Sequence, residues 1–295
     1  MRKILFHHIP KTAGTSLIQH AHAVFGSAVC PARYDYQVTD AMICDEAYTF
    51  YHGHFTRDVV TRFRALVPDA FIFTFVRHPF NRTISQFHNW TNRAKVRHEF
   101  STLALRNAEN RHARDLWTKF ESFILDLSLE EFLQLDDPDV AQVVNNIQCQ
   151  YMTDIEVPDH VRFNKAPFNA LSTYDFIGMQ ELYSPCLRII EAKWAIPSGS
   201  LGGGQRANTS DYAKVEGKYR ISHKELSLLE SRSAYDMALF HLSHALLLRD
   251  YADHLPPTGF DVGALADLPS VVEPVPRPHV SSDGATLFPS SERVL

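Results

Sequence analysis

The sequence predicts an α/β fold in three layers, with a central parallel sheet flanked by helices. Continuous apolar runs such as Ile4–Ile9 and Ala70–Val76 have the length and composition of strands that are buried on both faces. Stretches with the apolar spacing of a helix follow them. Strand and helix therefore alternate along the chain, which is typical of a parallel sheet with helices packed on both sides.

Four segments have strand character. Ile4–Ile9 comes first and ends at Pro10, which cannot donate a hydrogen bond to a neighbouring strand. Ala70–Val76 is the strongest candidate, because it is an unbroken apolar run rich in β-branched and aromatic residues. The other two are Tyr48–Phe55 and Tyr174–Met179.

The predicted helices share apolar residues at helical spacing. They are expected at Leu17–Phe25, Asp58–Leu66, Phe80–Asn92, Asp139–Gln150 and Glu181–Trp194, with a pair of amphipathic helices within 222–250. Residues 27–47 contain turn-forming residues and are expected to be irregular. The glycine-rich segment Ser198–Gln205 is expected to be a flexible loop.

Two regions have a distinctive composition. Residues 93–135 are expected to be mainly helical, and their basic side chains have two interpretations: a solvated helix face or a wall facing an anionic acceptor. From residue 255 onward proline, serine and glycine dominate, which predicts an extended or disordered tail over 255–295. The predicted folded domain therefore spans residues 1–254.

The composition excludes several classes of protein. The 295 residues, 45% hydrophobic and 21% charged, are ordinary for a globular chain, and the net charge of -5 argues against a nucleic-acid-binding protein. The four cysteines are widely spaced without a CxxC pair, so we expect reduced thiols in the core. The absence of a signal peptide and of an apolar run of bilayer length predicts a cytoplasmic protein without a transmembrane segment.

The segment after the first predicted strand is suited to bind an anion. A strand, a short loop of small residues and a helix N-terminus direct backbone N–H groups to one point. Thr12, Thr15 and Ser16 add hydroxyl donors, and Lys11 adds a positive charge. The loop is P-loop-like but is not a Walker A loop, because Lys11 precedes Gly14. No acidic strand end of the Walker B kind is visible, which favours chemistry without a metal.

Arg77 and Ser85 predict a second, separate phosphate site. Arg77 leaves the carboxyl end of the predicted strand Ala70–Val76, the edge at which open α/β sheets bind ligands. Ser85 lies eight residues further on, within the following helix. An arginine fork and a hydroxyl that reach the same point suit a phosphate group.

These two stretches resemble a known family. HIPKTAGTSL (8–17) resembles the 5′-phosphosulfate loop of sulfotransferases that use 3′-phosphoadenosine 5′-phosphosulfate (PAPS), and FVRHPFNRTISQF (75–87) resembles their 3′-phosphate motif. The segment His52-Gly53-His54 lies between them, as in carbohydrate sulfotransferases of the heparan and uronyl 2-O-sulfotransferase group. FIGMQEL (176–182) is similar to a further segment of that family. The resemblance is strong over residues 1–90 and thin over 91–255.

The resemblance implies a role for each matching residue. His54 would be the general base, a task that suits an imidazole with a pKa near 6.5, and His52 would support it or the acceptor. Lys11 would also be catalytic, by stabilising charge on the bridging oxygen as the sulfuryl group departs. The residues implied to bind PAPS are Lys11, Thr12, Ala13, Gly14, Thr15, Ser16, Arg77 and Ser85.

The remaining polar residues of the motifs have simpler interpretations. His7, His8 and His78 are expected to be structural, because nothing assigns them a proton to move. Arg82 suits a phosphate contact, a position on the helix surface or a buried ion pair. His52 and His54 around a glycine are compatible with metal ligation, but no third ligand stands at a suitable spacing, so no metal is expected.

The sequence thus predicts a sulfotransferase that moves a sulfuryl group from PAPS to a hydroxyl of a carbohydrate or glycolipid. Two alternatives stay open: an ATP-dependent phosphotransferase (a kinase of the P-loop type), and a nucleotide sensor without turnover. The modest charge gives no support for a long polyanion as the acceptor. The resemblance to membrane-anchored members does not extend to an anchor, which favours a bacterial-type enzyme.

Overall fold

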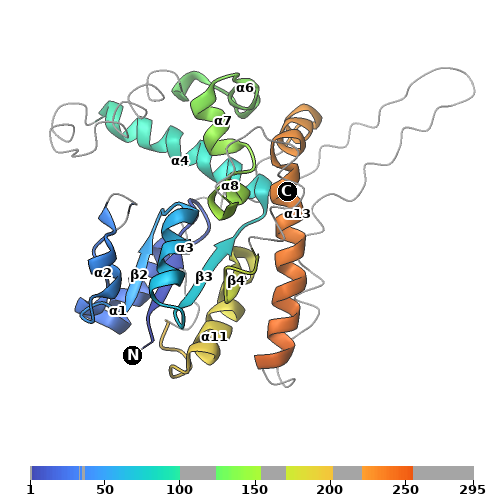
Figure 1. Ribbon diagram of the computed structural model, residues 1–295. Coiled ribbons are helices and arrows are strands. Elements are labelled where there is room, and N and C mark those ends of the chain that lie inside the picture. The colour runs from blue at the N-terminus through green and yellow to red at the C-terminus, as the bar shows by residue number, and fades with distance from the viewer. Residues whose placement is uncertain are drawn as a thin grey trace, which may run out of the picture.

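The computed structural model of the chain describes residues 2–32, 34, 37–99, 124–153, 171–201 and 221–254. At its centre lies a sheet of four parallel strands, which are β1 (Ile4–His7), β2 (Phe50–Gly53), β3 (Phe71–Val76) and β4 (Phe176–Met179). Their order is β2-β1-β3-β4 (Figure 1). Every strand residue is buried, as a parallel sheet covered on both faces requires. The four predicted strands are confirmed, each shorter than the run that predicted it.

Helices make up most of the remaining described chain. In chain order they are α1 (Gly14–Phe25), η1 (Gly26–Ala28), α2 (Asp40–Cys44), α3 (Arg57–Leu66), α4 (Pro79–Glu99), η4 (Ile124–Asp126), α6 (Leu129–Gln134), α7 (Pro138–Val144), α8 (Ile147–Thr153), η5 (Gln180–Leu182), α11 (Tyr183–Trp194) and α13 (His223–His254).

Adjacent side chains of β2 show how the helices form layers. Phe50 stacks on Phe25 at the end of α1, with ring centroids 5.4 Å apart. Tyr51 contacts Phe63 of α3 at 4.9 Å and points to the opposite face, because side chains alternate along a strand. Trp194 of α11 packs against Phe25, so α1 and α11 share one face. The predicted three-layer α/β fold is confirmed.

Two helix predictions need correction. The predicted helix Asp139–Gln150 is two helices, α7 and α8, because Asn146 between them has a left-handed φ of 46°, which asparagine tolerates better than most residues. By contrast, the predicted pair of helices within 222–250 is confirmed: α13 consists of two helical parts that meet in a kink at Ser233, where φ is −132°. Residues 27–47 are not irregular throughout: they contain α2, whose N-terminus is capped by the Thr39 hydroxyl.

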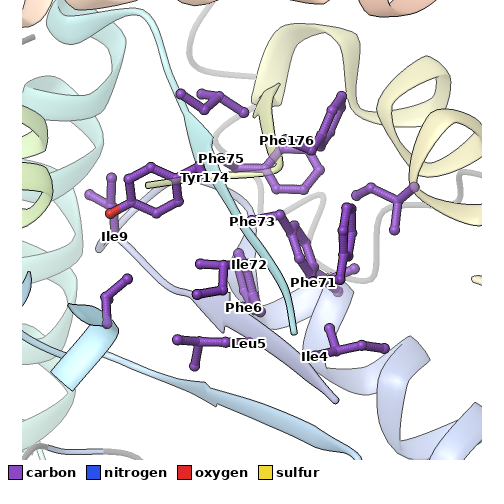
Figure 2. Close-up of a cluster of buried hydrophobic side chains, with 14 of the residues drawn as sticks. Ile4, Leu5, Phe6, Ile9, Phe71, Ile72, Phe73, Phe75, Tyr174 and Phe176 are labelled. Atoms are coloured by element: carbon purple, nitrogen blue, oxygen red, sulfur yellow. The ribbon is translucent and has the colours of Figure 1, made fainter. Parts of the chain in front are cut away.

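Aromatic side chains fill the core around the sheet. Phe6 of β1 stacks on Phe73 of β3 at 5.1 Å and meets Phe75 edge to face at 6.3 Å. Phe71 stacks on Phe73 at 5.5 Å, so one row of rings crosses the two central strands (Figure 2). This packing holds the carboxyl ends of β1 and β3 in a fixed relation, and the loops that follow begin there.

A second, smaller core lies among α4, η4, α6, α7 and the first part of α13 (Figure 1). Its largest members are Phe80, Phe87, Trp90 and Phe132. Leu229 of α13 belongs to this cluster, whereas residues of α13 beyond the bend at Ser233 belong to the sheet core. The long helix α13 therefore joins the two cores.

Several predictions fall outside the described residues: the tail 255–295, the second half of Ser198–Gln205 and the basic side chains of 93–114. Within the described part of the chain, no helix combines the length and the hydropathy needed to cross a membrane. All four cysteines are free thiols, but only Cys30, Cys149 and Cys186 are buried, whereas Cys44 is exposed and not a core residue.

Candidate functional site

The loop between β1 and α1 has an unusual backbone. Lys11 and Ala13 have φ values of 71° and 72°, in the left-handed region that residues other than glycine rarely adopt. Turns with left-handed residues direct successive N–H groups to one side and form concave anion sites. The Thr12 hydroxyl is buried and donates to the Ile9 carbonyl at 2.8 Å, so this side chain closes the loop.

The N-terminus of α1 adds a favourable field for an anion. Its N-cap residue, Ala13, makes no side-chain capping hydrogen bond, and the first turn contains no acidic residue. The N–H groups of such a turn carry a partial positive charge. Ser16 is buried in the first turn, whereas Thr15 is exposed and Lys11 is partly exposed. The predicted phosphate-binding residues 11–16 thus form one continuous loop and helix start.

Gly14 is required by a close approach. A Cβ atom at this position would lie 1.9 Å from Nε2 of His8, so any side chain here would displace the imidazole. The His8 ring is also held by Phe6 and His54, with ring centroids 5.3 Å and 4.3 Å away. Burial and then the neighbouring positive groups hold the pKa of His8 well below its usual value, so the ring is neutral at pH 7.

His54 follows β2 directly and is oriented by the backbone of His8. Its Nδ1 lies 2.8 Å from the His8 carbonyl oxygen. Because a carbonyl can only accept, Nδ1 carries the proton and Nε2 keeps its lone pair. Burial lowers the pKa of His54, and this hydrogen bond opposes the shift only in part. A neutral imidazole with Nε2 as acceptor has the chemistry of a general base.

His52 lies on the same face of β2 as His54, two residues earlier. Its side chain is buried beside His22 of α1, with ring centroids 6.0 Å apart, and beside Phe50 at 6.1 Å. His52 therefore packs against α1, and its supporting role stays a prediction.

Arg77 brings the second predicted motif to the first. It comes directly after β3, is 7% exposed, and its Nη1 lies 3.5 Å from the Lys11 carbonyl oxygen. Two motifs that are 66 residues apart thus meet at the carboxyl edge of the sheet. Ser85 is half-buried in the second turn of α4, and its joint action with Arg77 stays a prediction.

The residues that hold Arg77 were not predicted from the sequence. The side-chain amide of Gln148 hydrogen-bonds both the N–H and the carbonyl of Arg77, at 2.8 Å and 2.9 Å. Asp236 of α13 accepts from the backbone N–H of Gln148 at 3.1 Å. The residues that make these contacts are 71 and 88 positions apart in the sequence, so no local sequence pattern predicts them.

Arg82 belongs to this buried network. Its guanidinium donates to the Val143 carbonyl, and burial lowers its pKa to about 10, although the negative charge of Asp236 opposes the shift. The burial of Arg82 excludes the helix-surface interpretation, and the effect of the Asp236 charge favours the buried ionic role.

His7 and His78 are buried in apolar surroundings. His7 donates from Nε2 to the Phe55 carbonyl at 2.8 Å and accepts at Nδ1 from the Tyr174 hydroxyl at 2.7 Å. Burial lowers the pKa of both His7 and His78 to about 4, so both rings are neutral at pH 7. The expectation that His7 and His78 are structural fits these environments. Among the described residues, no group of three or more His, Cys, Asp or Glu side chains is arranged to hold a metal ion.

The comparison with known protein families gives one match. A sequence model described as "Sulfotransferase family" matches residues 1–199. The matched segment contains all four strands, the loop of residues 11–16, His54 and Arg77. A comparison with curated proteins found no match.

Proposed function

The chain belongs to the sulfotransferase family, and we propose that it transfers a sulfuryl group from PAPS to a hydroxyl of a carbohydrate or glycolipid. One observation carries the proposal: the anion-binding loop, Arg77 and His54 meet at the carboxyl edge of one sheet. Arg77 approaches the carbonyl of Lys11, and the ring of His8 lies between Gly14 and His54. The family match gives no support to the kinase alternative.

The residues around the loop fit the two phosphates of the donor. The uncapped N-terminus of α1 and the left-handed turn at Lys11 and Ala13 suit the 5′-phosphate, which carries the sulfuryl group. The buried guanidinium of Arg77 suits the 3′-phosphate, with Ser85 as a further donor. Thr12, Thr15 and Ser16 complete the proposed set.

His54 then acts as the base. PAPS, when bound, supplies the sulfuryl group, with adenosine 3′,5′-bisphosphate as the leaving group. His54 takes the acceptor's hydroxyl proton at Nε2 while the acceptor oxygen forms its bond to sulfur. The bond from sulfur to the bridging oxygen breaks, and its electron pair stays on the phosphate. Lys11 and the N–H groups of α1 stabilise the charge that develops on that oxygen.

The proposed class of acceptor rests on the group of sulfotransferases that the motifs resemble most. The segment His52-Gly53-His54 between the two phosphate motifs is similar to that of carbohydrate sulfotransferases, which supports a sugar hydroxyl as the acceptor. The net charge of -5 does not favour a long polyanionic chain. A neutral or weakly charged carbohydrate or glycolipid fits both features.

The test compares thermal stabilisation by adenosine 3′,5′-bisphosphate, ADP and ATP, with and without magnesium. A ligand at about 100 times its Kd should stabilise the fold by roughly 2.7 kcal/mol. We expect metal-independent preference for the bisphosphate in the wild type and in His54→Ala, and loss of that preference in Arg77→Ala. Equal or greater stabilisation by magnesium-ATP would contradict the proposal.

The same His54→Ala variant tests the base. Its rate of sulfuryl transfer should fall by about 10²- to 10⁴-fold, because a positioned general base contributes that much. Since burial lowers the pKa of His54, wild-type kcat/KM should rise with pH, and the midpoint of that rise should lie below the ordinary histidine pKa of about 6.5. Near-wild-type rates in His54→Ala would show that another group takes the proton.

A further inference from the structure

Arg77 lies just beyond the regular hydrogen bonding of the sheet. The pairing of β3 with β4 ends at Val76 opposite Met179, and the pairing of β3 with β1 ends at Thr74 opposite His7. The backbone of Arg77 is therefore one residue past the ladder with β4 and three residues past the ladder with β1. The backbone conformation of Arg77 has to be set by something other than a neighbouring strand. This conformation determines the direction in which the guanidinium points.

Gln148 supplies that constraint. Its Oε1 accepts from the N–H of Arg77 at 2.8 Å, and its Nε2 donates to the carbonyl of Arg77 at 2.9 Å. One side-chain amide thus satisfies both backbone groups of one residue, as a neighbouring strand would. Gln148 is fully buried, so both hydrogen bonds are shielded from competition by water.

Gln148 is itself fixed by α13. The two carboxylate oxygens of Asp236 accept from the N–H groups of Gln148 and Cys149, at 3.1 Å and 2.8 Å, in the first turn of α8. In return, the Asn146 side-chain oxygen accepts from the N–H groups of Tyr235 and Asp236 at 2.9 Å and 3.1 Å. The start of α8 and the segment of α13 after Ser233 therefore hold each other (Figure 1).

Asp236 and Arg82 carry opposite charges in this buried region. Asp236 is 1% exposed, and burial raises the pKa of its carboxyl, while the two N–H groups and the positive charge of Arg82 oppose that shift. Arg82 is equally buried. Movement of α8 away from Asp236 would leave buried charge and N–H groups without partners, which is costly. The contacts of α8 with Asp236 thus hold Gln148 in a fixed position.

We propose that Gln148 is the positioning residue that aims Arg77 at the 3′-phosphate of the donor, and so sets selectivity for 3′-phosphorylated nucleotides. The inference rests on the proposed function. The side-chain amide of Gln148 hydrogen-bonds the backbone of Arg77, so Gln148 acts through that residue. A guanidinium recognises a phosphate through directional, paired hydrogen bonds, so its affinity depends on the angle at which Arg77 leaves the sheet.

The test measures affinity for adenosine 3′,5′-bisphosphate and for adenosine 5′-monophosphate by isothermal titration calorimetry. Gln148→Met keeps the length of the side chain and removes both hydrogen bonds to Arg77. Gln150→Met is the matched control: Gln150 lies on the same helix and donates to the Asn145 carbonyl, away from Arg77. Thermal unfolding of each variant verifies the fold.

We expect Gln148→Met to bind the bisphosphate about tenfold more weakly, as the loss of a charge-assisted hydrogen bond would cause. Its affinity for the monophosphate should be unchanged, and Gln150→Met should bind both as the wild type does. In Arg77→Ala, the further change Gln148→Met should have no additional effect on the affinity for bisphosphate. If Gln148→Met does not fold, Gln148→Glu replaces it, since it keeps the acceptor and loses the donor to Arg77; we again expect a selective loss of bisphosphate affinity.

Two results would overturn the positioning role alone: equal weakening of both nucleotides by a folded Gln148 variant, or full retention of the bisphosphate preference. A wild type that binds the two nucleotides equally well would instead remove the proposed 3′-phosphate site, and the inference with it. The wild-type comparison thus separates failure of the proposed function from failure of the inference.

Discussion

Two supports of the candidate site differ in how they are built. The loop support consists of residues 8–16 with His54, and it depends on backbone conformation and steric fit: left-handed φ at Lys11 and Ala13, and the His8 ring against Gly14. The arginine support consists of Gln148, Asp236 and Arg82, and it depends on buried hydrogen bonds and charge.

The difference concerns how a fold fixes a functional group. In the loop support most of the interacting residues are neighbours in sequence, so the constraint appears as a motif. In the arginine support the partners are 71 and 88 residues apart in the sequence. Their side chains bind backbone groups, which every residue has, so no residue type marks the contact. A long-range support of this kind concentrates its stability in a few buried polar groups, so their removal should cost more than a change in the loop.

The largest expected effect is that of Asp236→Ala. The substitution leaves the N–H groups of Gln148 and Cys149 without their buried acceptor and removes the negative charge that acts on the buried guanidinium of Arg82. The loss of these interactions should cost about 3–5 kcal/mol. Urea unfolding measures the loss. Asp253→Ala, an exposed position of the same helix, should change the free energy of unfolding by less than about 0.5 kcal/mol.

A small effect of Asp236→Ala, comparable to that of Asp253→Ala, would contradict the comparison between the supports. Asp236→Asn tests the same comparison with a milder change, because one side-chain oxygen remains as an acceptor. This variant should fall between the wild type and Asp236→Ala in stability.

Gly14→Ala should have the next largest effect. The added Cβ would lie 1.9 Å from Nε2 of His8, a ring confined by Phe6 and His54, so the loop or the ring must move. Overpacking of this kind costs about 1–3 kcal/mol, and affinity for adenosine 3′,5′-bisphosphate should fall at least about tenfold. Thermal unfolding with and without the nucleotide measures both changes.

Removal of the opposing ring provides the control. In a His8→Ala background, Gly14→Ala no longer meets an imidazole and should cost much less than in the wild type. Additive losses in the double variant would mean that Gly14 is required for a reason other than the approach of His8.

The sheet and the loop support could be predicted because their signals are local. Ala70–Val76 predicted β3 within one residue, since a strand buried on both faces needs an unbroken apolar run. The motif at residues 8–17 predicted the loop, and the structure brings Arg77 to it. What the motif did not reveal is the role of His8, because only the fold places its ring between Gly14 and His54.

The arginine support could not be predicted for a physical reason. Asp139–Gln150 has the apolar spacing of one helix, and its break at Asn146 is stabilised by α13, far along the chain. The same contacts explain the bend of α13 near Ser233. A local propensity for helix was overridden by tertiary hydrogen bonds, which periodicity does not register.

A further expected effect, similar in size to that of Gly14→Ala, is a pH dependence of stability that one buried histidine in each support should cause. His7 lies in the sheet beside the loop support, and His78 follows Arg77. Burial is the main cause that lowers the pKa of each to about 4, well below the unfolded value near 6.5. The unfolded chain therefore binds these protons first, and stability falls as the pH decreases from about 6.5 towards 4. Each histidine should account for about 2 kcal/mol between pH 7 and pH 5.

Replacement by phenylalanine should affect the stability of the protein differently at the two histidines. His78 packs edge to face on Phe80 and Phe240, and its Nδ1 has no hydrogen-bond partner among the described residues. His78→Phe should therefore be nearly neutral at pH 7 and should remove about 2 kcal/mol of the acid loss. His7→Phe leaves the Phe55 carbonyl and the Tyr174 hydroxyl unpaired, so it should destabilise at every pH by about 1–3 kcal/mol. Urea unfolding from pH 5 to pH 8 measures both, and an unchanged pH dependence in His78→Phe would show that this ring is not the group that takes up the proton.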